Sequence, residues 1–185
     1  MENYLSSVKK QFEYYKSLAD KAFMQVTDDA QLNWQPDPNS NSIAVIVKHL
    51  AGNMLSRWSD FLNSDGEKPW RNREAEFEGG YESRAAMLEH WERGWQCLFG
   101  AINSLQAADL ERIIYIRNEG HTVLEAINRQ LAHYPYHIGQ IVYLARMLAG
   151  EQWRSLSIPK GGSEAFNAEK FAQEKQRKHF TDALK

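Results

Sequence analysis

Residues 122–148 read TVLEAINRQLAHYPYHIGQIVYLARML, and this stretch is the strongest indication of the fold. Its apolar residues recur at intervals of three and four, the spacing of one face of an α-helix, at positions 123, 127, 131, 134, 138, 141, 142, 144 and 148. Thr122 opens the helix, and Gly150 follows its last apolar position. In the second half of the stretch, apolar residues nearly encircle the helix axis. We therefore expect a long helix at the centre of a helical protein.

Three earlier segments have the same periodicity. We expect helices over residues 3–26, over about twenty residues that follow the N-cap Ser42 and end near residue 62, and over residues 82–105. The first two are separated by the run PDPNSN at residues 36–41, through which no helix would continue. The sequence therefore predicts an all-α fold with four long helices.

The segments between and after these helices are more polar. Residues 63–81 contain Gly and Pro and have no apolar period, so we expect a long loop of a kind that often carries function. The run Ile113–Ile116 is too short to assign to helix or strand. A chain of 185 residues is within the size of one domain, which we assign to residues 1–156. Residues 157–185 form a charged extension that we expect to pack on the helices or to trail from them.

Composition excludes several classes of protein. The formal net charge is −2, and no stretch clusters Lys or Arg with aromatic residues, so no nucleic-acid partner is expected. No run approaches the ~20 apolar residues that cross a membrane, and the N-terminus lacks the apolar segment of a signal peptide. Cys97 is the only cysteine, and we expect a buried, unreactive thiol. These features predict a cytoplasmic protein.

His133 and His137 are the first candidates for a functional site. Residues four apart lie on the same side of a helix, so both imidazoles could reach one metal ion. The pair lies in the most apolar part of the chain, where each imidazole must satisfy two ring nitrogens, and metal ligation satisfies one of them. Pro135 removes a backbone donor between them, which marks either a functional site or a simple bend. Two ordinary core or surface histidines remain the alternative interpretation.

His49 is the candidate for a third ligand, contributed by another helix. It lies beside an apolar stripe, with Asn53 one turn later and Gly52 positioned to let another backbone approach. By itself it could equally be a hydrogen-bonded core histidine. The remaining histidines are excluded, because they lie too far along the helix or in solvated or edge positions: His121, His90 and His179.

The sequence also resembles a known family. Residues 46–53, IVKHLAGN, and residues 133–141, HYPYHIGQI, resemble the corresponding segments of the DinB-like superfamily of damage-inducible bacterial proteins. Residues 54–70 and 157–167 resemble a branch of that superfamily without an assigned function. The likeness covers nearly the whole chain.

That resemblance implies an up-down-down-up four-helix bundle, often a homodimer, with one metal ion held by a histidine of the second helix and two of the fourth. His49, His133 and His137 occupy those positions. Members are associated with zinc or nickel, which suit imidazole ligands. Some relatives transfer low-molecular-weight thiols or isomerise maleylpyruvate with a thiol cofactor. The resemblance therefore implies a divalent metal site and leaves the reaction open.

Three functions are compatible with these residues. The first is a metal-dependent transferase of a low-molecular-weight thiol, because three neutral ligands leave the ion open positions for a small-molecule substrate. Asn53, Tyr136 and Gln140 would then be candidate polar wall residues. The second is a non-enzymatic, metal-stabilised stress or protein-interaction module that uses the loop and the extension. The third is a metal-assisted hydrolase, although no Glu stands beside the paired histidines as a general base.

Overall fold

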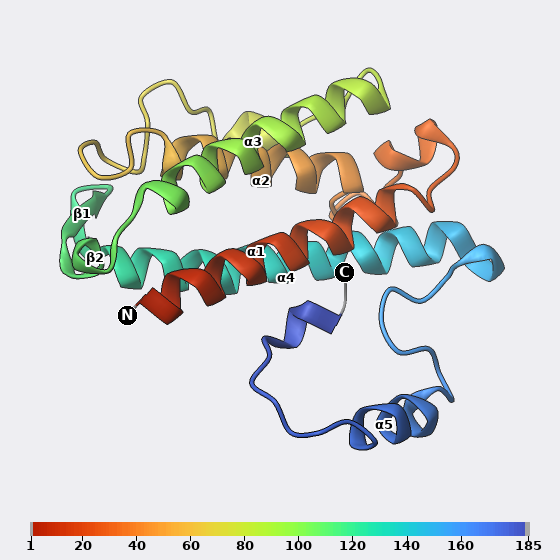
Figure 1. The fold of residues 1–185 in the computed structure, drawn as a ribbon. Coiled ribbons are helices and arrows are strands. Elements are labelled where there is room, and N and C mark those ends of the chain that lie inside the picture. Colours follow the sequence, from red (N-terminus) through yellow and green to blue (C-terminus); the bar gives the residue numbers. More distant parts are fainter. Residues whose placement is uncertain (1, 184–185) are drawn as a thin grey trace.

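The computed structural model describes residues 2–183, most of which are helical (Figure 1). These residues form the long helices α1 (Glu2–Phe23), α2 (Ile43–Trp58), α3 (Arg84–Ser104) and α4 (Val123–Ala149), and the short helix α5 (Ser163–Phe171). The prediction of a mainly helical protein is confirmed, with the addition of one two-stranded sheet. Among the described residues, no helix is both long and apolar enough to cross a membrane.

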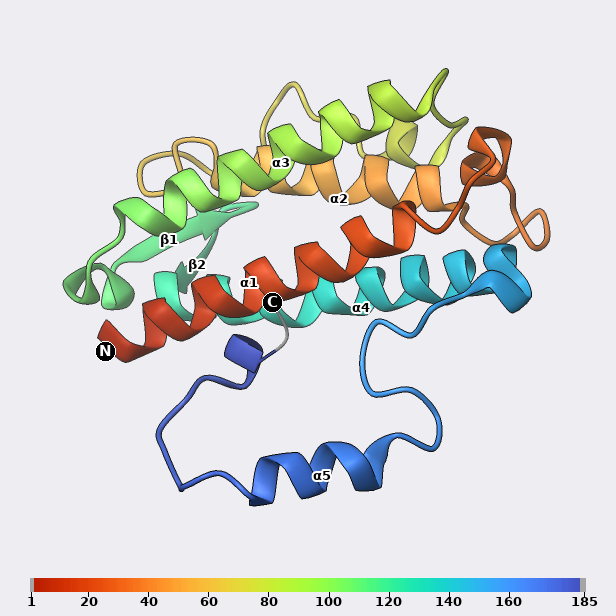
Figure 2. The same ribbon diagram turned by 45° about the vertical axis from the view of Figure 1, so that its right-hand side comes forward.

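The four long helices pack around one apolar core. Contacts join α2 to α3 and α1 to α4, and further contacts join α2 to α4 and α1 to α3. In Figure 2 the pair of α2 and α3 lies above the pair of α1 and α4. The helix α4 continues through Pro135. Aromatic side chains are prominent among the largest fully buried residues, including Phe12, Phe23, Trp91, Trp95 and Tyr134.

The helix ends follow local backbone chemistry. Ser42, Ser83 and Thr122 cap α2, α3 and α4, and each side-chain oxygen accepts a hydrogen bond from the backbone N–H three residues later. The helix α2 ends at Trp58 rather than near residue 62, because Ser59 has an extended backbone with ψ of 126° and Asp60 a left-handed one with φ of 46°.

The helix α1 also ends before its predicted limit. It stops at Phe23, three residues before Val26, although Val26 is buried in the core. Residues 24 and 25 form a turn, after which the N–H of Val26 donates to the carbonyl of Phe23. Burial at helical spacing therefore continues past the end of the helix, which explains why the apolar pattern predicted a longer one.

The run that the sequence left unassigned is a strand. β1 (Ile113–Ile116) pairs antiparallel with β2 (Glu119–Thr122), and the hairpin leads directly into α4. Exposed and buried residues alternate along β1, as expected for a strand with one face on the core. Both turn residues, Arg117 and Asn118, have positive φ, which is the geometry of a type I′ hairpin turn.

The long loop is attached to this hairpin. Asp65 accepts hydrogen bonds at 2.8 Å from the backbone N–H groups of both Arg117 and Asn118. The N–H of Gly66 donates to the carbonyl of Tyr115 at 2.8 Å. These contacts offset the cost of positive φ at Arg117, a residue that rarely adopts it. They also fix the position of the backbone that carries the Arg117 side chain.

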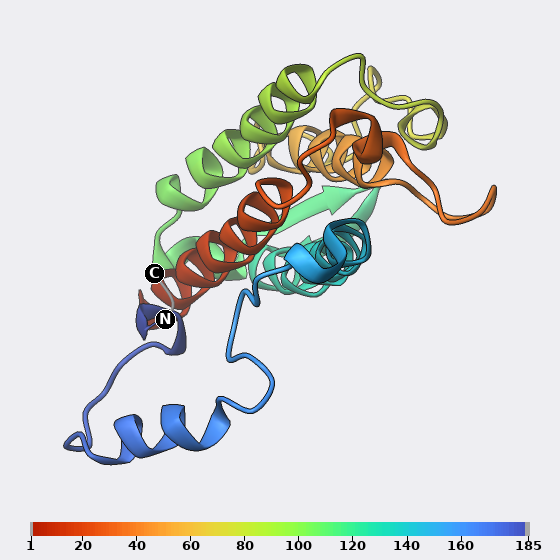
Figure 3. The same ribbon diagram turned by 90° about the vertical axis from the view of Figure 1, so that its right-hand side faces the viewer.

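The C-terminal extension contacts the helices only in part. The helix α5 has no buried residue and stands away from the four long helices (Figure 3). The following 3₁₀ turn, η5 (Phe180–Ala183), returns to α1, where Lys10 pairs with Asp182 at 2.8 Å and Phe180 packs against Tyr14. The domain boundary at residue 156 stays a prediction.

Candidate metal centre

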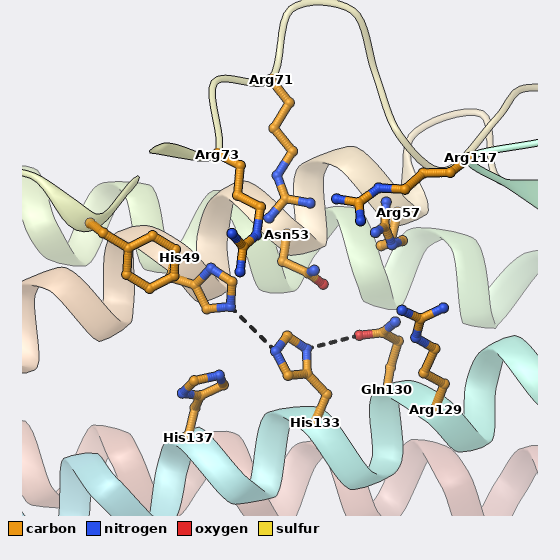
Figure 4. Close-up of a pocket in the computed structure, with 11 residues that line it drawn as sticks. His49, Asn53, Arg57, Arg71, Arg73, Arg117, Arg129, Gln130, His133 and His137 are labelled. Carbon is orange, nitrogen blue, oxygen red and sulfur yellow. Dashed lines mark hydrogen bonds between the residues drawn. The ribbon is translucent and has the colours of Figure 1, made fainter. Parts of the chain in front are cut away.

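The fold brings together the three histidines that the sequence singled out. His49 of α2 faces His133 and His137 of α4 (Figure 4). One ring nitrogen of each lies within 4.8 Å of those of the other two, and Nε2 of His49 is 3.3 Å from Nε2 of His133. His49 is buried, and the other two are half-buried. These residues could form a metal-binding site.

Tyr134 determines how α4 faces α2. Its side chain is fully buried, its hydroxyl donates to Oδ1 of Asn53 at 3.1 Å, and it accepts from Nε1 of Trp58 at 2.9 Å. Both partners belong to α2. Because His133 precedes Tyr134 and His137 follows it by less than one turn, this anchor sets the direction of both imidazoles.

Each imidazole has an oxygen partner at Nδ1. The pairs are His49 with Glu76 at 2.9 Å, His133 with Gln130 at 3.2 Å and His137 with Gln140 at 3.2 Å. An oxygen acceptor holds the proton on Nδ1 and leaves the lone pair on Nε2. Metal-binding histidines in proteins have this pattern of outer hydrogen bonds. The three Nε2 atoms are therefore the ligand atoms that this site offers.

The distance between two of these atoms fits a tetrahedral metal. Nitrogen ligands at about 2.0 to 2.1 Å from a tetrahedral ion lie about 3.3 Å apart. The Nε2 atoms of His49 and His133 are separated by 3.3 Å. Two imidazoles protonated at Nδ1 would otherwise direct their lone pairs at each other, so a cation between them is favoured.

The surroundings favour neutral imidazoles. Burial, together with the neighbouring His137 and His49, lowers the pKa of His133 to about 3. Burial and the neighbouring His49 also lower the pKa of His137. Neutral imidazole is the form that binds a metal, so at neutral pH these two residues need not lose a proton first.

Glu76 connects His49 to the long loop. It lies in the 3₁₀ turn η2 (Glu74–Phe77) and is 6% exposed. Besides the bond from His49, its carboxylate accepts from Nε of Arg71 at 2.7 Å and from Nη2 of Arg71 at 2.9 Å. Burial would raise the pKa of Glu76, but the hydrogen bonds from His49 and Arg71 lower it below its usual value. The ionised carboxylate accepts the Nδ1 proton of His49 and so fixes the orientation of its ring.

Gly52 makes room for this carboxylate. A Cβ atom at residue 52 would overlap Oε1 of Glu76. The sequence predicted a close approach at Gly52, but the neighbour is a side chain and not a backbone. Glu76 could move away from a larger residue only by weakening its bonds to Arg71 and His49.

A cavity of about 390 Å³ adjoins the three histidines. Asn53, Phe77 and Gln130 form part of its wall. The rest of the lining is strongly cationic and consists of Arg57, Arg71, Arg73, Arg117 and Arg129 (Figure 4). The volume is in the range of small-molecule sites. The site is thus unlike a closed structural zinc site, in which four protein ligands surround the ion.

The three candidate wall residues have different places. Asn53 lines the cavity, while its Oδ1 is engaged by Tyr134. Gln140 acts behind His137, as the acceptor for Nδ1. Tyr136 is 65% exposed on α4 and does not line this cavity, contrary to the expectation.

The excluded side chains lie outside the centre. His90 lies 2.6 Å from the hydroxyl of Tyr81, and His179 lies 3.0 Å from the hydroxyl of Ser7. His121 belongs to β2. Both contacting histidines are half-buried and have a hydrogen-bonding partner, so neither is fully solvated. Cys97 is only partly buried, with its sulfur 3.6 Å from the hydroxyl of Ser59.

Glu76, Gln130 and the arginines were not predicted from the sequence. Gln130 precedes His133 by three residues, a helical spacing at which side chains meet, so this partner could have been found. The same applies to Gln140 and His137. No such spacing connects Glu76 to His49, because Glu76 lies in a loop without periodicity.

A family described as a protein of unknown function, DUF1572, matches residues 1–162 of the chain. The match includes the four long helices, the hairpin and all three histidines. No curated protein and no solved structure matches the sequence.

Replacing Glu76 with Gln should weaken metal binding about 10- to 100-fold, because His49 loses an ionised acceptor at Nδ1. The measurement is a competition titration of zinc against a chromophoric chelator. Glu74→Gln is the matched control, since this side chain is 86% exposed in the same turn. Equal zinc affinities of the two variants would contradict the role given to Glu76.

Proposed function

The chain belongs to the DUF1572 family, and we propose that it binds one divalent transition metal through His49, His133 and His137 and acts on a small molecule in the adjoining cavity. The observation that carries this proposal is the convergence of three imidazoles, each with an oxygen partner at Nδ1, beside an open cavity. Zinc or nickel is proposed because imidazole suits both. The resemblance to the DinB-like superfamily, including its up-down-down-up bundle, supports the same assignment.

For the reaction, we propose transfer of a low-molecular-weight thiol to a small electrophile. When bound, the ion would lower the pKa of a thiol or water beside it. Sulfur forms a bond to an electrophilic carbon, the bond from that carbon to a leaving group such as chloride breaks, and chloride departs with the electron pair. The thiol proton passes to solvent. The cavity supports an enzyme more than a purely structural metal, because it leaves space for a small molecule beside His133 and His137.

The metal site is tested by substitution of its ligands. His137→Ala should abolish stoichiometric zinc or nickel binding, because two remaining imidazoles hold an ion much less tightly. Metal content after dialysis is measured by elemental analysis, and thermal unfolding with and without metal gives a second readout. His90→Ala is the control, since His90 contacts Tyr81 outside the centre. Full metal content in His49→Ala, His133→Ala and His137→Ala would refute the assignment.

The reaction is tested by a conjugation assay. The metal-loaded protein is incubated with bacillithiol, mycothiol, glutathione or coenzyme A and with a chlorinated aromatic or an epoxide. We expect a metal-dependent thioether product with at least one thiol, and loss of that product in His133→Ala. Strong metal-dependent stabilisation without turnover of any pair would contradict the transferase and favour the non-enzymatic, metal-stabilised module.

We also propose a homodimer formed through α4. Tyr136, Tyr143 and Met147 are 65%, 66% and 48% exposed, and their spacing of seven and four residues places them on one side of the helix. Exposed tyrosine and methionine side chains gathered on one side of a helix are typical of interfaces. Light scattering at micromolar concentration should give twice the chain mass of 21.4 kDa, and Tyr143→Glu should shift it toward a monomer. A monomeric wild-type protein would overturn this proposal.

A further inference from the structure

The five arginines of the cavity come from segments that are far apart in the sequence. Arg57 belongs to α2, Arg71 and Arg73 to the long loop, Arg117 to the hairpin turn and Arg129 to α4. In Figure 4 they surround the side of the cavity away from His137. The chain as a whole has a formal charge of −2, so this concentration of positive charge is local.

Two of these arginines form an inner set. The side chains of Arg57 and Arg71 are 7% and 2% exposed. Arg57 pairs with Glu67 at 3.2 Å, and Arg71 pairs with Glu76 at 2.7 Å. Their charges are therefore compensated within the protein, as buried charges must be.

The outer set, Arg73, Arg117 and Arg129, is not compensated in this way. Arg117 lies 3.1 Å from Glu67, but Arg57 already uses that carboxylate. Arg73 reaches only the exposed Glu74, at 3.7 Å. Among the side chains that the structure describes, those of residues 3–182, no carboxylate forms an ion pair with Arg129. Five guanidinium groups thus face the carboxylates of Glu67 and Glu76 and the exposed Glu74, so positive charge is in excess around the cavity.

The outer set is held in place by the fold. The carboxylate of Asp65 binds the backbone of the hairpin turn that carries Arg117. The bonds between Arg71 and Glu76 fix the loop on both sides of Arg73. Like charges that gather around one cavity destabilise the folded chain. Protein stability therefore gives no reason for this arrangement, whereas binding of an anion does.

We propose that the cavity binds a small molecule with at least two negative charges, whose carboxylate or phosphoryl oxygens contact Arg73, Arg117 and Arg129. Guanidinium groups bind both kinds of oxygen through paired N–H donors. The cavity of about 390 Å³ fits a small molecule. The inference deepens the proposed function by giving the charge class of its substrate, and it rests on that function for the substrate's place beside the metal. Anion binding itself requires only the arginines.

The test uses the full-length protein in phosphate-free buffer at low salt, first as purified and then after metal removal with EDTA. Calorimetric titrations use tricarballylate and pyrophosphate as anionic probes and tricarballylamide as the neutral counterpart. We expect one of the anions to bind and the neutral amide not to bind. Arg129→Gln and Arg73→Gln should each weaken binding about tenfold, because each removes charge-assisted hydrogen bonds. Arg93→Gln is the control, as Arg93 is exposed on α3 and does not line the cavity.

The probe that binds identifies the chemistry of the anion. Binding of tricarballylate assigns carboxylates, and binding of pyrophosphate assigns phosphoryl groups. Failure of both anions to bind, equal binding of the amide, or the same loss in Arg93→Gln overturns the proposal. The titration is repeated without metal, so the two proposals can fail separately. If His137→Ala retained full metal content while the anion still bound after EDTA treatment, the metal site would be refuted and the anion site would stand.

Discussion

The carboxylate of Glu76 is the contact on which the candidate centre depends. It lies between Nδ1 of His49 and the guanidinium of Arg71, and all three side chains are largely buried. A buried carboxylate is costly unless hydrogen bonds compensate it, and here both partners do so. The same contact joins α2 to the long loop. Gly52 is required at this place, because any side chain there would displace the carboxylate.

A rigid frame supplies the other half of the centre. Apolar residues surround much of α4, and Tyr134 bonds to two residues of α2 within the core. His133 and His137 therefore already face α2, and no flexible segment has to become ordered when an ion binds. Ligands carried on packed helices lose little conformational entropy when an ion binds. The arginines, in contrast, come mostly from the loop and the hairpin, so the metal position and the charged wall have separate structural origins.

Periodicity explains what could be predicted from the sequence. The four long helices follow from apolar residues at helical spacing, and the pairing of His133 with His137 follows from the same spacing. His49 was identified as the third candidate from its position beside an apolar stripe. The DUF1572 family model matches residues 1–162, and the family has no assigned function from which a reaction could be taken.

The remaining features depend on contacts between distant segments. The hairpin turn uses Arg117 and Asn118 in place of glycine, and it is stabilised by Asp65 from another loop, so no local turn signal revealed it. For the same reason, Glu76 and the loop arginines Arg71 and Arg73 could not be predicted, because they lie in a polar loop without an apolar periodicity. X-ray absorption spectroscopy of the metal-loaded protein tests the three-histidine site most directly. We expect three imidazole nitrogens at about 2.0 to 2.1 Å from one ion, and two in His49→Ala. A first coordination shell without imidazole, or one unchanged in His49→Ala, would contradict it.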